Sequence, residues 1–340
     1  MTRAVGASNV TSRGLTSDRI FSEPAAAVLV FVLFALLPLI TSGYPIYILP
    51  QYMMFGILAM SLGLIWGFAG ILSFGQAAFF AIGAYAMGLA MQRGLIINPA
   101  YAGLLLAVVT GGLVALFTGY FLFSAGVRGT HFVLVTLALS IIVERLTVSQ
   151  SQITGGWNGM FVDRLSLTFG PLGAVSLYDD AAFFYFTLAV VAAVYFLLFW
   201  FSISRFGKVL VGIRENEDRI VSLGINPAVY KTGAFMLSGM IAGLAGALYG
   251  TQANFVSPSI AGVLFSTQVV VWVAIGGRNS LLGALLGGIG VAYLANLLSA
   301  ATPDYWQLIL GLIFMAVIVY FRGGVAGAVE RLIDFSRGRG

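Results

Sequence analysis

The chain has 340 residues, of which 60% are hydrophobic and only 9% are charged, and its formal net charge at pH 7 is +5. A soluble domain carries roughly 25% charged residues, so the composition excludes a water-exposed globular fold and predicts a surface covered by membrane lipid. The sequence has no cysteine and one histidine, which excludes thiolate and His-rich metal sites, and its scattered basic residues do not indicate nucleic-acid binding.

The two ends of the chain are polar. Residues 1–22 are rich in Ser, Thr, Gly and Arg, which predicts a disordered cytoplasmic N-terminus, and residues 323–340 form a basic tail that we also expect in the cytoplasm. No small-residue cleavage site follows the first apolar stretch. We therefore expect a retained first helix rather than a removed signal peptide.

Apolar runs fill the region between these ends, 23–322, which we expect to be the transmembrane domain. A helix needs about 20 apolar residues to cross a bilayer. The predicted spans are 25–43, 47–69, 76–92, 99–123, 131–149, 181–203, 232–251, 262–276, 280–300 and 305–321. Two of them, 76–92 and 262–276, are short and flanked by Gly, which indicates re-entrant or broken helices. The predicted fold is an all-α, polytopic transmembrane bundle of eight to ten spans.

Charge predicts the orientation of this bundle. With ten crossings and the N-terminus inside, three basic residues lie outside, Arg93, Arg145 and Arg164, and the other 14 of the 17 lie inside. Basic residues concentrate on the cytoplasmic side of multi-pass proteins. The expected topology is therefore N-in/C-in, in a bacterial inner (cytoplasmic) membrane.

Two Gly-rich stretches are candidates for a substrate pathway. The first, Gly70–Gly83, carries polar residues among apolar ones, and the second lies on the predicted outer side. Broken helices expose backbone N–H and C=O groups in mid-membrane, where they can solvate a polar solute. The pathway candidates are Ser73, Gly75, Gln76, Thr154, Gly155, Gly156 and Asn158. Small residues for helix packing, and an ordinary turn, are the alternative interpretations.

The longest polar segment predicted inside is 204–231. Its apolar residues Val209, Ile213, Ile220 and Leu223 have spacings that a helix could place on one side, and Gly224 occupies an expected helix C-cap. An amphipathic helix of this kind either docks a soluble partner or lies on the membrane surface, and the pattern alone leaves both open.

The same segment carries a resemblance to a known family. The sequence SRFGKVLVGIRENEDRIVSLGINPAVYKTGAFMLSGMIAGLAGALYG, which starts at Ser204, resembles the cytoplasmic coupling (EAA) loop of ABC-importer permeases, and more narrowly that of branched-chain amino acid permeases of the M type. Three more blocks resemble the family in the same order: GFAGILSFGQAAFFAIGAYA, ITGGWNGM and VAIGGRNSLLGALLGG. The chain departs from the pattern at Gly212, Val221, Asn279 and Ala284.

The resemblance implies a permease subunit of an ATP-binding-cassette importer that carries branched-chain amino acids. Its implied partners are two ATPase subunits, a second permease subunit, most simply the H-type one, and a periplasmic solute-binding protein. The residues implied to couple the permease to the ATPases are Arg214, Glu215, Asn216, Glu217, Leu223 and Gly224. No phosphate-binding G-x-x-x-x-G-K-S/T motif is present, so we expect the partners to bind ATP and this chain to need no cofactor.

Three other functions were weighed against this one. Cousins of the family carry urea or short amides, and no residue separates these cargoes. An ion-coupled carrier needs an intramembrane carboxylate, for which Glu144 is the one candidate, and an interfacial ion pair or helix contact explains that residue. A membrane enzyme is disfavoured because the predicted spans contain no paired carboxylates or His clusters.

Overall fold

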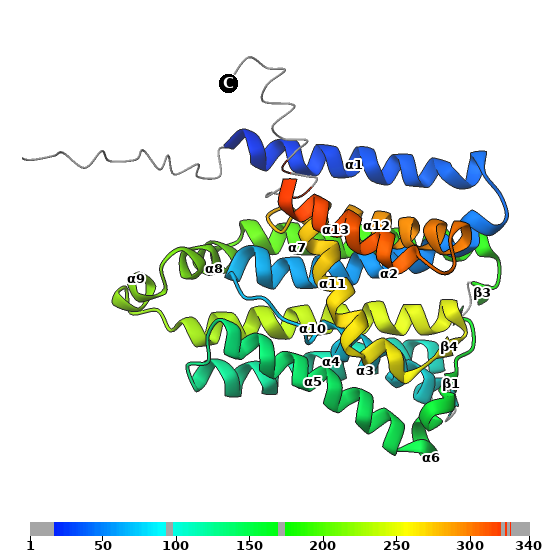
Figure 1. Cartoon of the computed structure of the whole chain (residues 1–340), viewed down its shortest axis with the longest axis horizontal. Helices are drawn as coiled ribbons and strands as arrows, with labels where there is room; N and C mark the ends of the chain where they lie inside the picture. The colour runs from blue at the N-terminus through cyan, green and yellow to red at the C-terminus, as the bar shows by residue number, and fades with distance from the viewer. Residues whose placement is uncertain (1–16, 93–97, 169–173, 321–323, 325–326, 328–340) are drawn as a thin grey trace, which may run out of the picture.

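A computed structural model describes residues 17–92, 98–168, 174–320, 324 and 327, and these form a bundle of helices with small β-ribbons at one end (Figure 1). The α-helices are α1 (Ser17–Ile40), α2 (Tyr44–Gly63), α3 (Gln76–Gln92), α4 (Pro99–Ser124), α5 (Thr130–Ser149), α6 (Ser151–Thr154), α7 (Asp180–Ile203), α8 (Arg205–Glu215), α9 (Glu217–Ser222), α10 (Pro227–Ala253), α11 (Val263–Gly276), α12 (Leu281–Ala301) and α13 (Trp306–Tyr320).

Shorter elements connect the helices. A π-helical segment, η1 (Leu64–Ala69), continues α2, and two 3₁₀ turns are η2 (Gly156–Asn158) and η4 (Pro258–Ala261). The strands pair antiparallel, β1 (Met160–Phe161) with β4 (Phe255–Val256) and β2 (Ser166–Thr168) with β3 (Ala174–Ser176). The strands lie at one end of the bundle and α8 and α9 project from the other, which we call the α8–α9 end (Figure 1).

The described helices confirm an all-α, multi-pass membrane bundle. Six are long and apolar enough to cross a membrane: α2 with η1, α4, α5, α7, α10 and α12. Shorter apolar helices are α11, α13 and the part of α1 from Pro24. The start of α1 and the end of α13 lie toward the α8–α9 end, in agreement with the predicted placement of both termini on one side (Figure 1).

The two short predicted spans are indeed broken crossings. Helix α3 starts at Gln76, and the chain before it, residues 70–75, is not helical. Helix α11 has 14 residues and follows β4 and η4 rather than a continuous helix. Left-handed backbone at Gly70 (φ 71°) ends η1, a conformation that glycine adopts without steric cost.

The broken crossings belong to two units with the same order of elements, whose first helices, α2 and α10, run in opposite directions (Figure 1). In the first unit α2 precedes the break, α3 and α4; in the second α10 precedes a break, α11 and α12. The units interlock, since α4 packs along α10 and α12 packs along α2. Inverted repeats of this kind are common in transporters, whose substrate sites lie where the units meet.

Glycines allow the close contacts between these units. A Cβ added at Gly246 of α10 would collide with the Phe80 carbonyl of α3, and one added at Gly243 would collide with the Ala107 carbonyl of α4. On the other side, a Cβ at Gly288 of α12 would lie 2.8 Å from the Phe55 carbonyl oxygen of α2. Gly243 and Gly246 therefore form a small-residue packing face on α10.

The outer surface of the bundle is apolar along α4 and α5. Large exposed side chains on these two helices include Leu105, Phe117, Phe121, Leu134 and Leu146. Such a surface is suited to contact with lipid tails. The predicted terminal segments are largely outside the described residues: 1–16 are not described, α1 already begins at Ser17, and of 323–340 only Gly324 and Gly327 are described.

Candidate functional site

The coupling loop, residues 204–231, contains two short helices instead of the single one suggested by its apolar spacing. The Ser204 hydroxyl accepts a hydrogen bond from the Gly207 N–H at 3.3 Å and caps α8. Asn216 then takes an extended conformation, φ −158°, and its side-chain oxygen accepts from the Arg219 N–H at 3.0 Å. An Asn side chain readily accepts a hydrogen bond from a free backbone N–H in the first turn of a helix. Asn216 therefore ends α8 and starts α9.

The end of α9 confirms the predicted glycine cap. Gly224 has φ 79°, its N–H donates to the Val221 carbonyl at 2.9 Å, and the Ile225 N–H donates to the Ile220 carbonyl at 3.3 Å. This pair of bonds is the Schellman motif, which favours glycine at the left-handed position. Leu223 does not join an inner apolar face as its spacing suggested: its side chain is 68% exposed, because the break at Asn216 changes the helical phase.

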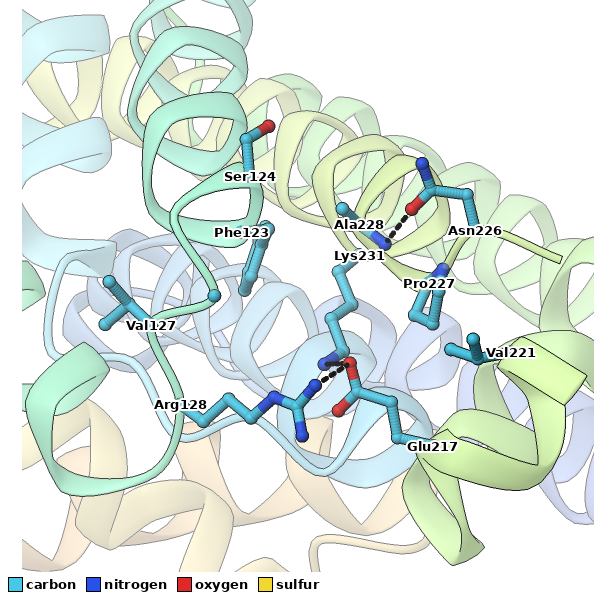
Figure 2. Close-up of a pocket in the computed structure, with 11 residues that line it drawn as sticks. Phe123, Ser124, Val127, Arg128, Glu217, Val221, Asn226, Pro227, Ala228 and Lys231 are labelled. Atoms are coloured by element: carbon cyan, nitrogen blue, oxygen red, sulfur yellow. Dashed lines mark hydrogen bonds and ion pairs between the residues drawn. The ribbon is translucent and has the colours of Figure 1, made fainter.

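An ion-pair cluster fixes α9 to the rest of the bundle (Figure 2). The Glu217 carboxylate lies 2.7 Å from the Lys231 ammonium of α10 and 3.5 Å from the Arg128 guanidinium of the α4–α5 turn. Lys231 is nearly buried, with 9% of its side chain exposed. A buried charge needs such a partner, so this pair holds α9 against the start of α10.

Arg214, in the last turn of α8, fixes that helix to the end of α2. Its guanidinium Nη1 donates a hydrogen bond to the Gly67 carbonyl of η1. A Cβ added at Gly70 would lie only 2.7 Å from the Arg214 Cγ, so glycine is needed for the arginine to lie there. Gly67 also packs against the Arg278 carbonyl in the turn between α11 and α12. Three segments therefore meet at the π-helical end of the α2 crossing.

The break that follows η1 is bonded to α5. The Phe74 N–H donates to the Thr136 hydroxyl at 3.1 Å, and the Ser140 hydroxyl donates to the Phe74 carbonyl at 2.8 Å. Ser73 accepts from the Gly75 N–H at 3.1 Å. These bonds satisfy backbone groups that would otherwise be unpaired inside a membrane.

Gln76, the first residue of α3, links three helices. Its side-chain oxygen accepts from the Ser61 hydroxyl of α2 at 3.1 Å, and its amide donates to the Ser238 hydroxyl of α10 at 3.1 Å. Only 1% of Gln76 is exposed. The structure therefore brings the inner pathway candidates Ser73, Gly75 and Gln76 together, closed to solvent in this conformation.

Several partners of these candidates were missed by the sequence reasoning. Ser61, Thr136, Ser140 and Ser238 are fully buried within apolar helices. Each lies among apolar residues in a predicted span, and hydroxyls at such positions are signals for interhelical hydrogen bonding. The glycine-rich breaks themselves give no indication of which hydroxyls lie beside them.

The outer pathway candidates lie at the strand end, away from Gln76. Gly155 and Gly156 have positive φ angles of 76° and 58°, so they form a tight turn that favours glycine. The buried Thr154 hydroxyl donates to the Gln150 carbonyl at 2.9 Å, whereas Asn158 is exposed. Glu144, half-buried on α5, lies against Gly262 at the start of α11, which is the helix contact considered for it.

The match of residues 44–318 to one family model decides the assignment. That model describes the permease component of a branched-chain amino acid transport system. The chain belongs to this family. It is therefore a transport permease and not itself an enzyme.

The permease is similar to several curated proteins along most of its length. It is 28% identical over 315 residues to the high-affinity branched-chain amino acid transport permease protein LivM of Escherichia coli, covering 86% of this chain and 72% of the relative. It is 24% identical over 271 residues to a probable LivM of Methanocaldococcus jannaschii, with 71% and 77% covered. An autoinducer 2 import permease, LsrC of Escherichia coli, is 26% identical over 251 residues, with 71% and 70% covered. No solved structure matches the chain significantly.

Proposed function

We propose that this permease carries branched-chain amino acids into the cytoplasm across a bacterial inner membrane, driven by ATP hydrolysis in separate subunits. The observation that carries the proposal is the Arg214–Gly67 hydrogen bond, because it connects a cytoplasmic loop to an interrupted membrane helix. Through this bond, an ATPase subunit that moves the loop would also move the end of the α2 crossing.

The outer face of the coupling loop fits a protein partner. Val221, Leu223 and Val229 expose 52%, 68% and 62% of their surface although they lie beyond the apolar spans. Glu215 and Asn216 are exposed beside them. A mixed face of this kind, apolar at its centre and polar around it, is typical of a docking surface. We assign it to one of two ATPase subunits, which bind the ATP, so that this chain itself carries no cofactor.

Movement of the coupling loop would reach the broken crossing through α8. Arg214 contacts Gly67 and Gly70, and the non-helical segment that starts at Gly70 leads to Ser73, Gly75 and Gln76. A displacement of α8 would shift this segment and expose its polar groups to the pathway. Backbone N–H groups and the N-terminal end of α3 would then be available to a substrate carboxylate.

The cargo proposal follows the relatives. A protein named for high-affinity branched-chain amino acid transport matches 86% of the chain, whereas the autoinducer 2 permease matches 71% of it. The further partners we propose are a second, H-type permease subunit and a periplasmic binding protein, which would meet the turn Thr154–Asn158. Urea or short amides are the alternative cargo.

Uptake by the reconstituted complex tests the function. Proteoliposomes that hold both permeases and both ATPase subunits, with ATP inside and the binding protein outside, should accumulate labelled leucine. Replacing ATP with a non-hydrolysable analogue should stop uptake, and a protonophore should not. Leucine uptake by the permeases without the ATPase subunits would contradict the proposal and favour an ion-coupled carrier.

A further inference from the structure

A cavity of about 330 Å³ lies at the α8–α9 end, beside the ion-pair cluster (Figure 2). Three segments bound it: the α4–α5 turn with Arg128, helix α9 with Glu217, and the start of α10 with Lys231. Small-ligand pockets have volumes of roughly 300–1,000 Å³, so this cavity suits a small metabolite. Two of its lining residues, Glu217 and Val221, belong to the coupling loop, but no transport role assigned above uses the cavity itself.

The charges around the cavity do not balance. Lys231 neutralises Glu217 through the short 2.7 Å contact, whereas Arg128 reaches the same carboxylate oxygen only at 3.5 Å. The Arg128 side chain is 61% exposed. A guanidinium has five N–H donors in a planar fork that matches a carboxylate. Both contacts use Oε1 of Glu217, so the second carboxylate oxygen can accept from an incoming ammonium while Arg128 donates to the carboxylate of the same molecule.

The remaining wall is apolar and fixed. Phe123, Val127, Val221, Pro227 and Ala228 line it, and the Phe123 ring stacks on Phe132 with centroids 4.9 Å apart. Phe123 is 8% exposed, so its ring is held by the bundle rather than by a ligand. A cation, an anion and an apolar wall together match a zwitterion that carries an apolar side chain.

We propose that this cavity binds a free apolar α-amino acid and thereby slows the transporter. The ligand carboxylate pairs with Arg128, its ammonium approaches Glu217, and its side chain packs on the Phe123 wall. The regulatory part of this inference rests on the proposed function, since the ligand has the chemistry of the delivered cargo and the cavity lies on the delivery side. Occupancy of the site would therefore rise with the concentration of imported amino acid in the cytoplasm.

The mechanism of inhibition follows from the three segments. A ligand that touches the α4–α5 turn, α9 and α10 at once stabilises their present arrangement. The coupling loop must move relative to the bundle for ATP to drive transport. A ligand that binds one arrangement better shifts the population toward it and opposes the movement.

Binding is measured first, without transport. The complete complex in nanodiscs, free of binding protein and ATP, is equilibrated with labelled leucine, and with labelled glutamate as a control. We expect saturable leucine binding that falls by about tenfold or more in affinity in Arg128→Gln, as expected for the loss of a charge-assisted, bidentate contact. Arg128→Lys should retain part of it. Ser124→Phe, which places a bulky ring at an exposed lining position and leaves the charges intact, should also weaken it.

Inhibition is measured second. Proteoliposomes preloaded with ATP and millimolar leucine should show an initial uptake rate about fivefold lower than vesicles preloaded with glutamate, a typical size for coupling between sites. In Arg128→Gln, which also removes one contact to Glu217, the rates with leucine inside and with glutamate inside should be equal to each other, whatever their absolute value. Inhibition that persists in both Arg128→Gln and Ser124→Phe would place the effect in the pathway and overturn the proposal.

Two other outcomes would also test the proposed binding site. If leucine does not bind, the proposal fails, and nanodiscs with and without anionic lipid then show whether Arg128 instead holds a phosphate headgroup. If leucine binds at Arg128 but the complex does not transport it, the cavity assignment stands and the proposed cargo fails. The binding measurement thus separates failure of this inference from failure of the proposed function.

Discussion

The guanidinium of Arg214 donates a hydrogen bond to the backbone carbonyl of Gly67, so the coupling loop touches the π-helical end of a membrane crossing directly. π-Helical turns are uncommon and occur often at functional sites. The bond is to a backbone atom, so substitution of Gly67 by another residue would not remove the acceptor. The arginine is therefore the position at which the contact can be tested.

Replacing Arg214 should uncouple ATP hydrolysis from uptake. Arg214→Ala removes a hydrogen bond from a charged donor, worth about 1.5–3 kcal/mol, and we expect leucine uptake to fall by about tenfold or more. ATPase activity of the assembled complex should persist. Uptake and phosphate release measured on the same proteoliposomes check this, with the exposed neighbour Arg205→Ala as the control. Equal loss of both activities would indicate failed assembly instead.

Gly224 should tolerate few other residues. Its φ of 79° costs a residue with a Cβ roughly 1–2 kcal/mol, so Gly224→Ala should loosen the end of α9. Asn adopts this conformation more easily, and Gly224→Asn should be milder. Amide hydrogen exchange of residues 217–225, together with the affinity for the ATPase subunits, measures the effect. Identical exchange in both variants would contradict the strain argument.

Glycines that pack against backbone should tolerate substitution by alanine less well than glycines that face open space. Gly246→Ala places a methyl group against the Phe80 backbone, where overpacking costs about 1–3 kcal/mol, whereas a Cβ at Gly290 would meet nothing within 4 Å. Gly290→Ala is therefore the matched control. Thermal unfolding of the detergent-solubilised permease, followed by size-exclusion chromatography, should show a lower Tm for Gly246→Ala alone.

The Gln76 cluster should affect transport beyond its effect on stability. Gln76→Leu removes bonds to Ser61 and Ser238 and leaves buried hydroxyls less well paired, at a cost of about 1–3 kcal/mol. Ser61→Ala removes one bond of the same cluster without changing Gln76. If Gln76 lies on the pathway, uptake by Gln76→Leu should fall well below that of Ser61→Ala after both are normalised to folded protein.

Glu144 tests the ion-coupled alternative. Because it contacts Gly262 at the start of α11, Glu144→Gln should keep most of that packing and leave ATP-driven uptake within about twofold of normal, as for other surface substitutions without a buried charge partner. Uptake is measured at constant internal ATP with and without a protonophore. Abolished uptake in Glu144→Gln, with a matching dependence on the proton gradient, would support a carrier.

Periodicity and length predicted most of this fold. Apolar runs of membrane-spanning length gave α4, α5, α7, α10 and α12 close to their observed bounds, because a bilayer imposes the same constraint on every crossing. Short length and flanking glycines also predicted the breaks before α3 and α11. Left-handed Gly224 followed from its place after the last apolar residue of the loop.

The contacts between distant segments were beyond the reach of the sequence. Arg214 and Gly67 are 147 positions apart, and Gln76 and Ser238 are 162 apart, so no local pattern relates them. The break at Asn216 was not predicted, because the apolar spacing suggested one continuous helix. The Asn216 side chain instead favours the N-terminal end of a new helix. The pairing of Lys231 with Glu217 is likewise visible only in the three-dimensional structure.

The division of the coupling loop at Asn216 gives one docking surface two separate points of attachment. Helix α8 is fastened to the first inverted unit at the end of α2, and α9 to the second unit at the start of α10. Under the proposed function, a force that an ATPase subunit applies to this surface would therefore reach both units. The angle between the two short helices that meet at Asn216 would then set how the force is divided.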